Sequence, residues 1–357
     1  MVVDVHCHVG QTSRRMQSAS PFFFERGEWE AYFSRPLARR IPWPVVRWLL
    51  GVDHAADTNA IDAAIERFLL WHMLNAPSVD RVVVLAFDAC HDDQGRPHGR
   101  AATTDAPGTH LYVSNTYVRD LCTLHPEKLW FGASIHPYRA DALAALDEVA
   151  DAGAVLVKWL PLTQNINAAD PRAIAFLKHA GRIGVPLLVH YGGEMSLPAP
   201  RSEFEDPAPL LHALRRVRSG GVIPVVIVAH AATPSLWPFT RARHFETLAQ
   251  ALLGEFHDAP LYADIAALAT WNRTRWLKEL LRRKEFHAKL VHGSDFPIPS
   301  FPLLFRRRLG PAYRIVTDCA SRVERDLQLK RRLGLPPDVF TRMGDILRSL
   351  GRPARRV

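Results

Sequence analysis

Short runs of aliphatic and β-branched residues alternate with helix-like stretches along almost the whole chain. This alternation limits the fold more than any other feature. The runs predict eight strands, at 2–9, 80–88, 129–135, 154–160, 185–191, 222–229, 260–265 and 289–295. Most of them are nearly continuous Val, Ile and Leu, which is typical of parallel strands covered on both faces. We therefore predict an α/β fold, a (β/α)8 TIM barrel, with an open doubly wound sheet as the alternative.

Helical periodicity fills the intervals between the predicted strands, at 60–75, 110–124, 140–152, 170–183, 207–218, 241–256 and 271–286. Asp170 followed by Pro171 is typical of a helix start. Gly153 and Gly184 are typical of helix ends that precede a strand. No glycine-rich fingerprint follows the first strand, which argues against a dinucleotide-binding sheet.

Two segments lie outside the βα units of what we expect to be one domain, residues 1–357. Residues 10–59 form an insert after the first strand that is rich in aromatic side chains and Arg. Such an insert would lie at the barrel mouth where active sites form, so we expect a lid-like segment, with a homodimer contact as the alternative. Residues 312–350 predict additional C-terminal helices.

Composition limits the cellular setting and the partners. With 357 residues and 48% hydrophobic composition, the chain can bury a core without disulfides. No apolar run reaches the roughly 18 residues of a membrane span. The start lacks a secretory signal and the four cysteines are scattered, so we expect a cytoplasmic location and no membrane partner. The net charge of +9 is spread over the chain, which favours a solvated surface over a nucleic-acid partner.

Six ionisable residues lie near the C-terminal ends of predicted strands, where buried strands contain few such groups. They are His6 and His8 on the first strand, Lys158 on the fourth, His190 on the fifth, His230 on the sixth and Asp295 on the eighth. Alternation along the strand puts the first two on one face, and paired imidazoles can bind a divalent metal. Each residue alone has an ordinary structural explanation. Their common position at the catalytic end of a barrel favours a metal centre.

Lys158 and Asp295 have further chemical roles open to them. Burial would lower the pKa of Lys158 and free its amine. The amine would then form an ion pair, a Schiff base or a carbamate that bridges two metals. A carboxylate at Asp295 would bind metal and also accept a proton from a metal-bound water.

The arrangement resembles the amidohydrolase superfamily, and within it the amidohydrolase 2, or amidohydrolase-related, family of metal-dependent TIM-barrel hydrolases and non-oxidative decarboxylases. The motifs that carry this resemblance are DVHCHVG at 4–10, GASIHP at 132–137 and HGSDFP at 292–297. The resemblance covers most of the chain apart from the insert.

The resemblance implies one of two ligand sets. In the two-metal version, His6, His8 and Asp295 bind the first metal, and a carbamylated Lys158 bridges to a second metal that His190 and His230 hold. In the mononuclear version, the ligands are His6, His8, His190 and Asp295, and His230 acts as an acid–base catalyst. Because the chain retains every ligand, we expect two metals. Zinc is the expected metal, with manganese, nickel or iron as alternatives.

We therefore expect a hydrolase in which a metal-activated hydroxide cleaves an amide, lactone or ester of a small molecule. Asp295 would transfer the proton, and His230 or a second cation would polarise the carbonyl. Arg273 and Arg275 favour an anionic substrate. Four residues near the mouth are candidates for substrate contact: His136, Trp159, Tyr191 and Asp264. Hydrogen bonding at the barrel rim is the alternative for His136 and Asp264.

Three other functions remain open. The main alternative is a mononuclear-metal decarboxylase of an aromatic or enoic acid, in which His230 protonates the carbon. A TatD-like nuclease is less favoured, because those enzymes normally have Glu on the fourth strand where this chain has Lys158. A non-catalytic barrel is disfavoured by the complete ligand set.

Overall fold

The computed structural model describes residues 1–15, 29–53, 56–104, 107–235 and 242–352, so parts of the predicted insert lie outside the described residues. Eight parallel strands form one sheet in the order β1-β4-β6-β7-β8-β9-β10-β11. Their bounds are β1 Val3–His8, β4 Arg81–Leu85, β6 Leu129–Ala133, β7 Leu156–Trp159, β8 Leu187–His190, β9 Val226–Ala229, β10 Leu261–Asp264 and β11 Leu290–Val291. Each strand lies within a predicted run.

The sheet closes through backbone hydrogen bonds between β1 and the segment that directly follows β11. Val5 N donates to His292 O at 3.1 Å, and His8 N donates to Phe296 O at 2.7 Å. These bonds join the first strand to the last, so no strand of the sheet is left as an edge. The predicted TIM barrel is confirmed.

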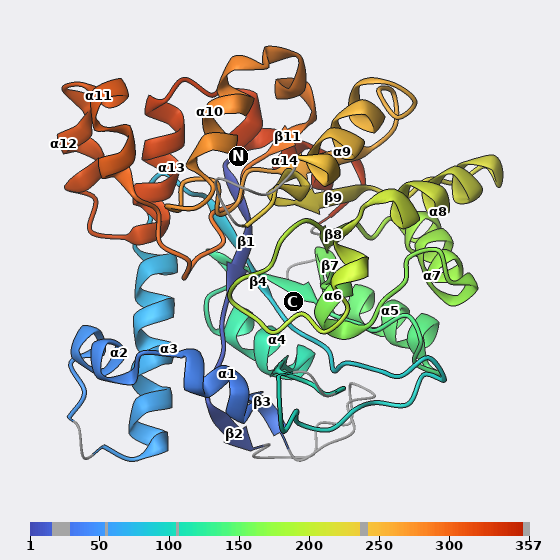
Figure 1. The fold of residues 1–357 in the computed structure, drawn as a ribbon, viewed down its shortest axis with the longest axis horizontal. Helices are drawn as coiled ribbons and strands as arrows, with labels where there is room; N and C mark the ends of the chain where they lie inside the picture. The colour runs from blue at the N-terminus through green and yellow to red at the C-terminus, as the bar shows by residue number, and fades with distance from the viewer. Residues whose placement is uncertain (16–28, 54–55, 105–106, 236–241, 353–357) are drawn as a thin grey trace.

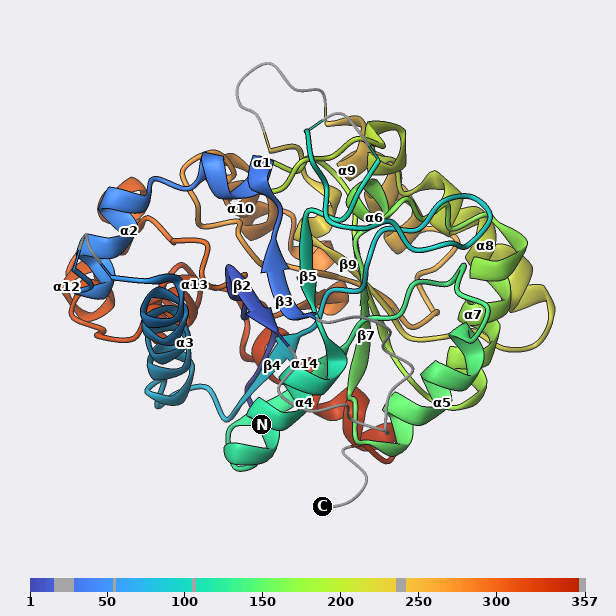
Figure 2. The same ribbon diagram turned by 90° about the horizontal axis from the view of Figure 1, so that it is seen from below.

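Helices follow the strands and cover the outside of the barrel. The longer ones are α3 Thr58–Leu74, α4 Asn115–Leu124, α5 Ala142–Asp151, α7 Pro171–Arg182, α8 Ala208–Ser219, α9 Arg243–Leu253 and α10 Thr274–Arg282. Figures 1 and 2 show α5, α7 and α8 on one side of the strands and α3 on the other. The side chain of Asp170 caps α7 by accepting Arg172 N–H, with Pro171 in the first turn, as predicted.

Both predicted helix-end glycines have the backbone conformation that ends a helix. Gly153 has φ +90° and Gly184 has φ +67°, a left-handed region that side chains with a Cβ disfavour. The short elements between the main helices are α6 Pro161–Gln164, α11 Arg306–Leu309, and the 3₁₀ turns η1 Ser202–Glu205, η2 His230–Ala232, η3 Lys284–Lys289 and η4 Pro302–Phe305.

The predicted C-terminal extension forms three helices, which are α12 Ala312–Thr317, α13 Arg322–Arg332 and α14 Pro337–Ser349. Met343 and Leu347 of α14 pack with Val3 and Val5 of β1 in the apolar interior of the barrel. This helix covers the N-terminal end of the strands. Figure 2 shows the start of the chain at the lower side of the barrel and α1, Arg35–Arg40, at the upper side. The C-terminal end of the strands is left for a site.

Part of the predicted helix at 110–124 is a strand instead. Leu111–Val113 form β5, which pairs with β3, Trp29–Phe33, and β3 pairs with β2, Ser13–Arg15, in a three-stranded antiparallel sheet. Local periodicity did not show this strand because its partner lies far away in the sequence. The insert also contains α2, Trp43–Leu50. Within the described residues, no helix combines the length and apolar character that crossing a membrane requires.

Candidate metal centre

The six predicted metal-site residues meet at the C-terminal end of the barrel. They come from, or directly follow, five different strands, and all six line one cavity of about 410 Å³. They are His6, His8, Lys158, His190, His230 and Asp295. The barrel geometry explains the convergence, because the carboxyl ends of its parallel strands meet around one mouth.

Asp295 lies at the centre of this group. Its Oδ1 is 2.9 Å from His8 Nε2 and 3.3 Å from His6 Nε2, which confirms that the two histidines of β1 share one face. Its Oδ2 is 3.9 Å from His230 Nε2. Potential ligand atoms of His6, His230 and Asp295 all lie within 4.8 Å of one another. These three residues can hold one metal ion.

The rings of His6 and His230 form hydrogen bonds through Nδ1, on the side away from the cavity. These bonds direct Nε2 of each ring into the site. His6 Nδ1 is 2.7 Å from Asp264 Oδ2, and His230 Nδ1 is 2.9 Å from Ala266 O. Each Nδ1 faces an acceptor and therefore carries the proton, so the lone pair is on Nε2. This is how carboxylate or carbonyl partners orient metal-binding histidines.

Lys158 and His190 complete the inner wall. The Lys158 side chain is 1% exposed, and its Nζ is 3.0 Å from His6 Nε2. His190 Nε2 is buried without a hydrogen-bond partner in the described part of the chain, and Glu194 Oε2 lies 3.6 Å from it. A buried nitrogen without a partner is costly. A bound cation would satisfy it, so the residues fit a metal site on their own geometry.

Burial sets the protonation of these groups. It lowers the pKa of His6, His190 and His230 well below the usual histidine value, and the nearby Lys158 ammonium lowers all three further. The rings are therefore neutral, which is the form that binds metals. Burial also lowers the pKa of Lys158 to about 8 and raises that of Asp264 to about 7.

The backbone is strained at two of the predicted ligands. His230 has φ +54° and Asp295 has φ +66°, both in the left-handed region. Such conformations cost about 1–3 kcal/mol each and are retained mostly at functional sites. The strain turns both side chains toward the same cavity.

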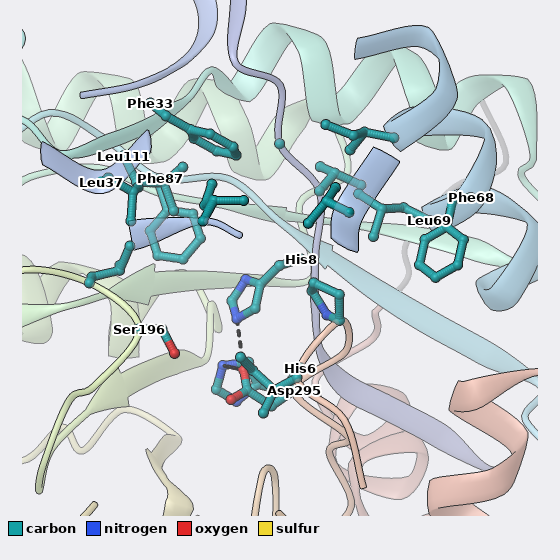
Figure 3. Close-up of a pocket in the computed structure, with 18 of the residues that line it drawn as sticks. His6, His8, Phe33, Leu37, Phe68, Leu69, Phe87, Leu111, Ser196 and Asp295 are labelled. Carbon is teal, nitrogen blue, oxygen red and sulfur yellow. Dashed lines mark hydrogen bonds and ion pairs between the residues drawn. The ribbon is translucent and has the colours of Figure 1, made fainter. Parts of the chain in front are cut away.

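Most of the remaining cavity wall is apolar and comes from segments outside the strands, with Glu194, Ser196 and Arg322 as its polar members. It includes Phe33, Leu37 and Leu111 near the insert sheet, Phe68 and Leu69 of α3, and Phe87 after β4. Figure 3 shows these side chains on the side of His8 away from Asp295. The strand pattern does not predict these residues, but the i, i+3, i+7 spacing of Trp43, Val46 and Leu50 indicates an apolar helix face.

The four predicted substrate-contact residues do not line this cavity. Trp159 follows Lys158 and therefore points outward, where its Nε1 donates to Ile135 O at 2.8 Å. Tyr191 likewise follows His190 and is buried outside the cavity wall. These two side chains belong to the core.

His136 and Asp264 also lie outside the cavity wall, where they form hydrogen bonds and do not line the substrate space. His136 is buried, and its Nε2 is 2.8 Å from Gln164 O. Asp264 is 0% exposed and lies behind His6. Both have the hydrogen-bonding role that the sequence left as the alternative.

The two arginines that favoured an anionic substrate lie outside the cavity wall as well. Arg273 is buried and donates to Gly193 O, whereas Arg275 is exposed over the ring of Trp276. Among the described lining residues, the Lys and Arg side chains are Lys158 and Arg322. The Arg322 guanidinium lies 4.9 Å from the centre of the Phe68 ring.

The chain resembles solved barrels over nearly its whole length. An uncharacterized TIM-barrel protein from Bordetella bronchiseptica is 15% identical, with 98% of this chain and 99% of that chain covered and a TM-score of 0.57. A probable 2-pyrone-4,6-dicarboxylic acid hydrolase from Acinetobacter baumannii is 13% identical, with 96% and 98% covered and a TM-score of 0.50. A 2,6-dihydroxybenzoate decarboxylase from Rhizobium is 12% identical, with 94% and 98% covered and a TM-score of 0.46.

The likenesses to the first two of these structures agree with the barrel fold. No family model matches the sequence, and no curated protein sequence matches it.

Proposed function

We propose that the chain is a metal-dependent hydrolase of the amidohydrolase superfamily, which cleaves an amide, lactone or ester. The observation that carries the proposal is the meeting of four histidines, a lysine and a carboxylate in one cavity at the catalytic end of the barrel. The fold likeness to a probable hydrolase agrees with this function. The choice of reaction rests on the site itself.

The ligand atoms suit a borderline divalent metal, with zinc as the first choice. His6, His8 and Asp295 would hold one cation. His190 and His230 would hold a second, with a carbamylated Lys158 between the two. Such a metal, when bound, polarises a carbonyl and lowers the pKa of a coordinated water toward ~7.

Asp295 is the proposed proton carrier. His8 and His6 approach its Oδ1, and His230 Nε2 lies 3.9 Å from its Oδ2. Oδ2 is thus placed to accept a proton from the attacking water. The same oxygen would return the proton to the leaving nitrogen or oxygen, so that one carboxylate acts first as base and then as acid.

The tautomer of His230 favours hydrolysis over decarboxylation. Its Nδ1 donates to Ala266 O, so Nε2 carries a lone pair and suits a metal ligand. In the decarboxylase alternative, this Nε2 would have to carry the proton that is delivered to carbon. Burial opposes the doubly protonated ring, because it lowers the pKa of His230 well below the usual value.

Metal analysis followed by a reaction screen tests the proposal. Protein purified without chelator is analysed for metal per chain beside the His6→Ala variant, and is then assayed with amides, lactones and esters. We expect bound zinc or a similar metal, lost in the variant, together with hydrolysis. A chain that stays metal-free after reconstitution with zinc or manganese would overturn the metal centre. Release of carbon dioxide from aromatic or enoic acids without any hydrolysis would replace the hydrolase with the decarboxylase.

A further inference from the structure

The cavity that contains the candidate metal centre changes character along its length. Apart from Arg322, whose guanidinium lies 4.9 Å from the centre of the Phe68 ring, the ionisable residues gather at one end, around Asp295. Away from them the wall is built by apolar side chains of the insert, α3 and the segment after β4. The Phe87 ring joins the two parts, because its centre lies 5.1 Å from that of His8. If the reactive group of a substrate reaches the candidate metal centre, the rest of the substrate lies against apolar side chains.

Several of these side chains are only partly buried by the chain itself. Phe33, Phe68 and Leu111 line the cavity and keep part of their surface accessible. Covering apolar surface contributes about 25 cal/mol for each Å² removed from water. A polar dianion would gain nothing from this wall, whereas an apolar group would. The cavity of about 410 Å³ has room for roughly a dozen water-sized groups of about 30 Å³ each.

Helix α2 lies at the mouth of the cavity. Val46 and Leu50 line the cavity from one face of the helix. Leu49 also lines it and is 44% exposed, so it lies at the mouth. Val45 and Trp48 point to solvent, at 52% and 78% exposed. An apolar arm that extends from the metal centre would therefore pass along α2.

We propose that the substrate is an ester, amide or lactone with an extended apolar acyl arm, and that the arm lies between α2, α3 and Phe87. This inference rests on the proposed hydrolase function and names its substrate class. Hydrolysis of the ester form consumes one water, breaks the acyl–oxygen bond and releases the alcohol and the apolar acid. The apolar wall holds the acyl arm while the ionisable end meets the carbonyl.

Two neighbouring residues of α2 provide a matched test. Val46→Trp places a large ring in the cavity, whereas Val45→Trp places the same ring on the solvent side of the helix. Both variants and the parent protein, reconstituted with zinc, are assayed with p-nitrophenyl acetate and p-nitrophenyl octanoate. We expect kcat/KM of the parent to be at least tenfold higher for octanoate. Val46→Trp should remove this preference, whereas Val45→Trp should keep it.

A binding measurement separates this proposal from the hydrolase function. The neutral fluorophore N-phenyl-1-naphthylamine should bind the parent and Val45→Trp, be displaced by octanoate, and bind Val46→Trp at least tenfold more weakly. Equal binding to both variants, or a kcat/KM that does not change with chain length, would overturn the apolar arm. Normal binding and displacement, lost in Val46→Trp, with no ester, amide or lactone hydrolysed, would support the apolar site and overturn the hydrolase.

Discussion

Asp264 Oδ2 lies 2.7 Å from His6 Nδ1, so a carboxylate on the seventh barrel strand orients a ring on the first. The other oxygen of the same carboxylate accepts the backbone N–H of His230 at 2.6 Å and that of Ala266 at 3.0 Å. One buried side chain therefore holds two predicted metal ligands in place from behind. Asp264 is a positioning residue, although the sequence alone suggested contact with substrate.

Replacing Asp264 by Asn should weaken metal binding and change the fold little. The amide is nearly the same size, and its oxygen can still accept the backbone N–H groups. Its NH2 would face His6 Nδ1 and favour the tautomer that protonates Nε2, which removes the lone pair. We expect zinc affinity to fall about 10- to 100-fold, measured by competition with a chelator. The control is Asp88→Asn, a buried carboxylate that pairs with Arg139; equal losses in both variants would contradict the assignment.

Replacing Lys158 by Met should change the metal content from about two per chain to one. The ammonium would no longer approach His6, and no carbamate could form between the two ligand groups. Elemental analysis of the refolded and zinc-loaded protein measures the result. Lys128→Met serves as the control, because Lys128 donates to the carbonyls of Ala76 and Val79 on the barrel exterior. An unchanged content of one metal in the parent and the variant would support the mononuclear version.

His72 should make stability fall as the pH is lowered. Its Nδ1 accepts Arg322 N–H at 3.2 Å, and burial with the nearby Arg322 and Arg325 lowers its pKa to about 4. Because the unfolded chain binds this proton near pH 6.5, stability is fully present above that pH and is lost as the pH falls toward 4. Between pH 7.5 and 5.5 the parent should lose about 1 kcal/mol more than His72→Asn, whose side-chain oxygen keeps the acceptor without titrating.

Urea unfolding of the parent and His72→Asn at the two pH values measures this difference. Because both proteins contain all the other histidines, the difference between their losses of unfolding free energy reports on His72. Equal losses in the two proteins would show that His72 does not control the pH dependence.

Gly293 should tolerate no side chain. A Cβ there would lie 2.8 Å from His6 Cβ and 3.2 Å from Ala266 Cβ. Gly293→Ala should therefore cost about 1–3 kcal/mol of unfolding free energy by overpacking, and should weaken metal binding by displacing His6. The control is Gly99→Ala, where a Cβ would meet nothing within 4 Å. Denaturant unfolding and chelator competition check both effects, and a variant with parental stability and affinity would contradict the predicted clash.

The barrel and the inward position of the six candidate ligands could be predicted because both depend on local sequence. Strand alternation assigns Lys158 to the inside, and the same rule should have assigned Trp159 to the outside core, where it packs 5.1 Å from the Phe176 ring. Strand β5 and the apolar cavity wall could not be predicted in this way. Both depend on segments that meet only after folding, as when Tyr112 stacks on Tyr32 at 5.5 Å.

The hydrogen bonds that close the barrel also set the order in which the site can form. His6 and His8 lie at the very start of the chain, whereas Asp295, whose amide donates to His6 O at 2.7 Å, follows the last strand. During translation the two histidines leave the ribosome long before the carboxylate that completes their site. We expect nascent chains that stop short of Asp295 to lack the assembled centre, because they do not yet contain the carboxylate that approaches both histidines of β1.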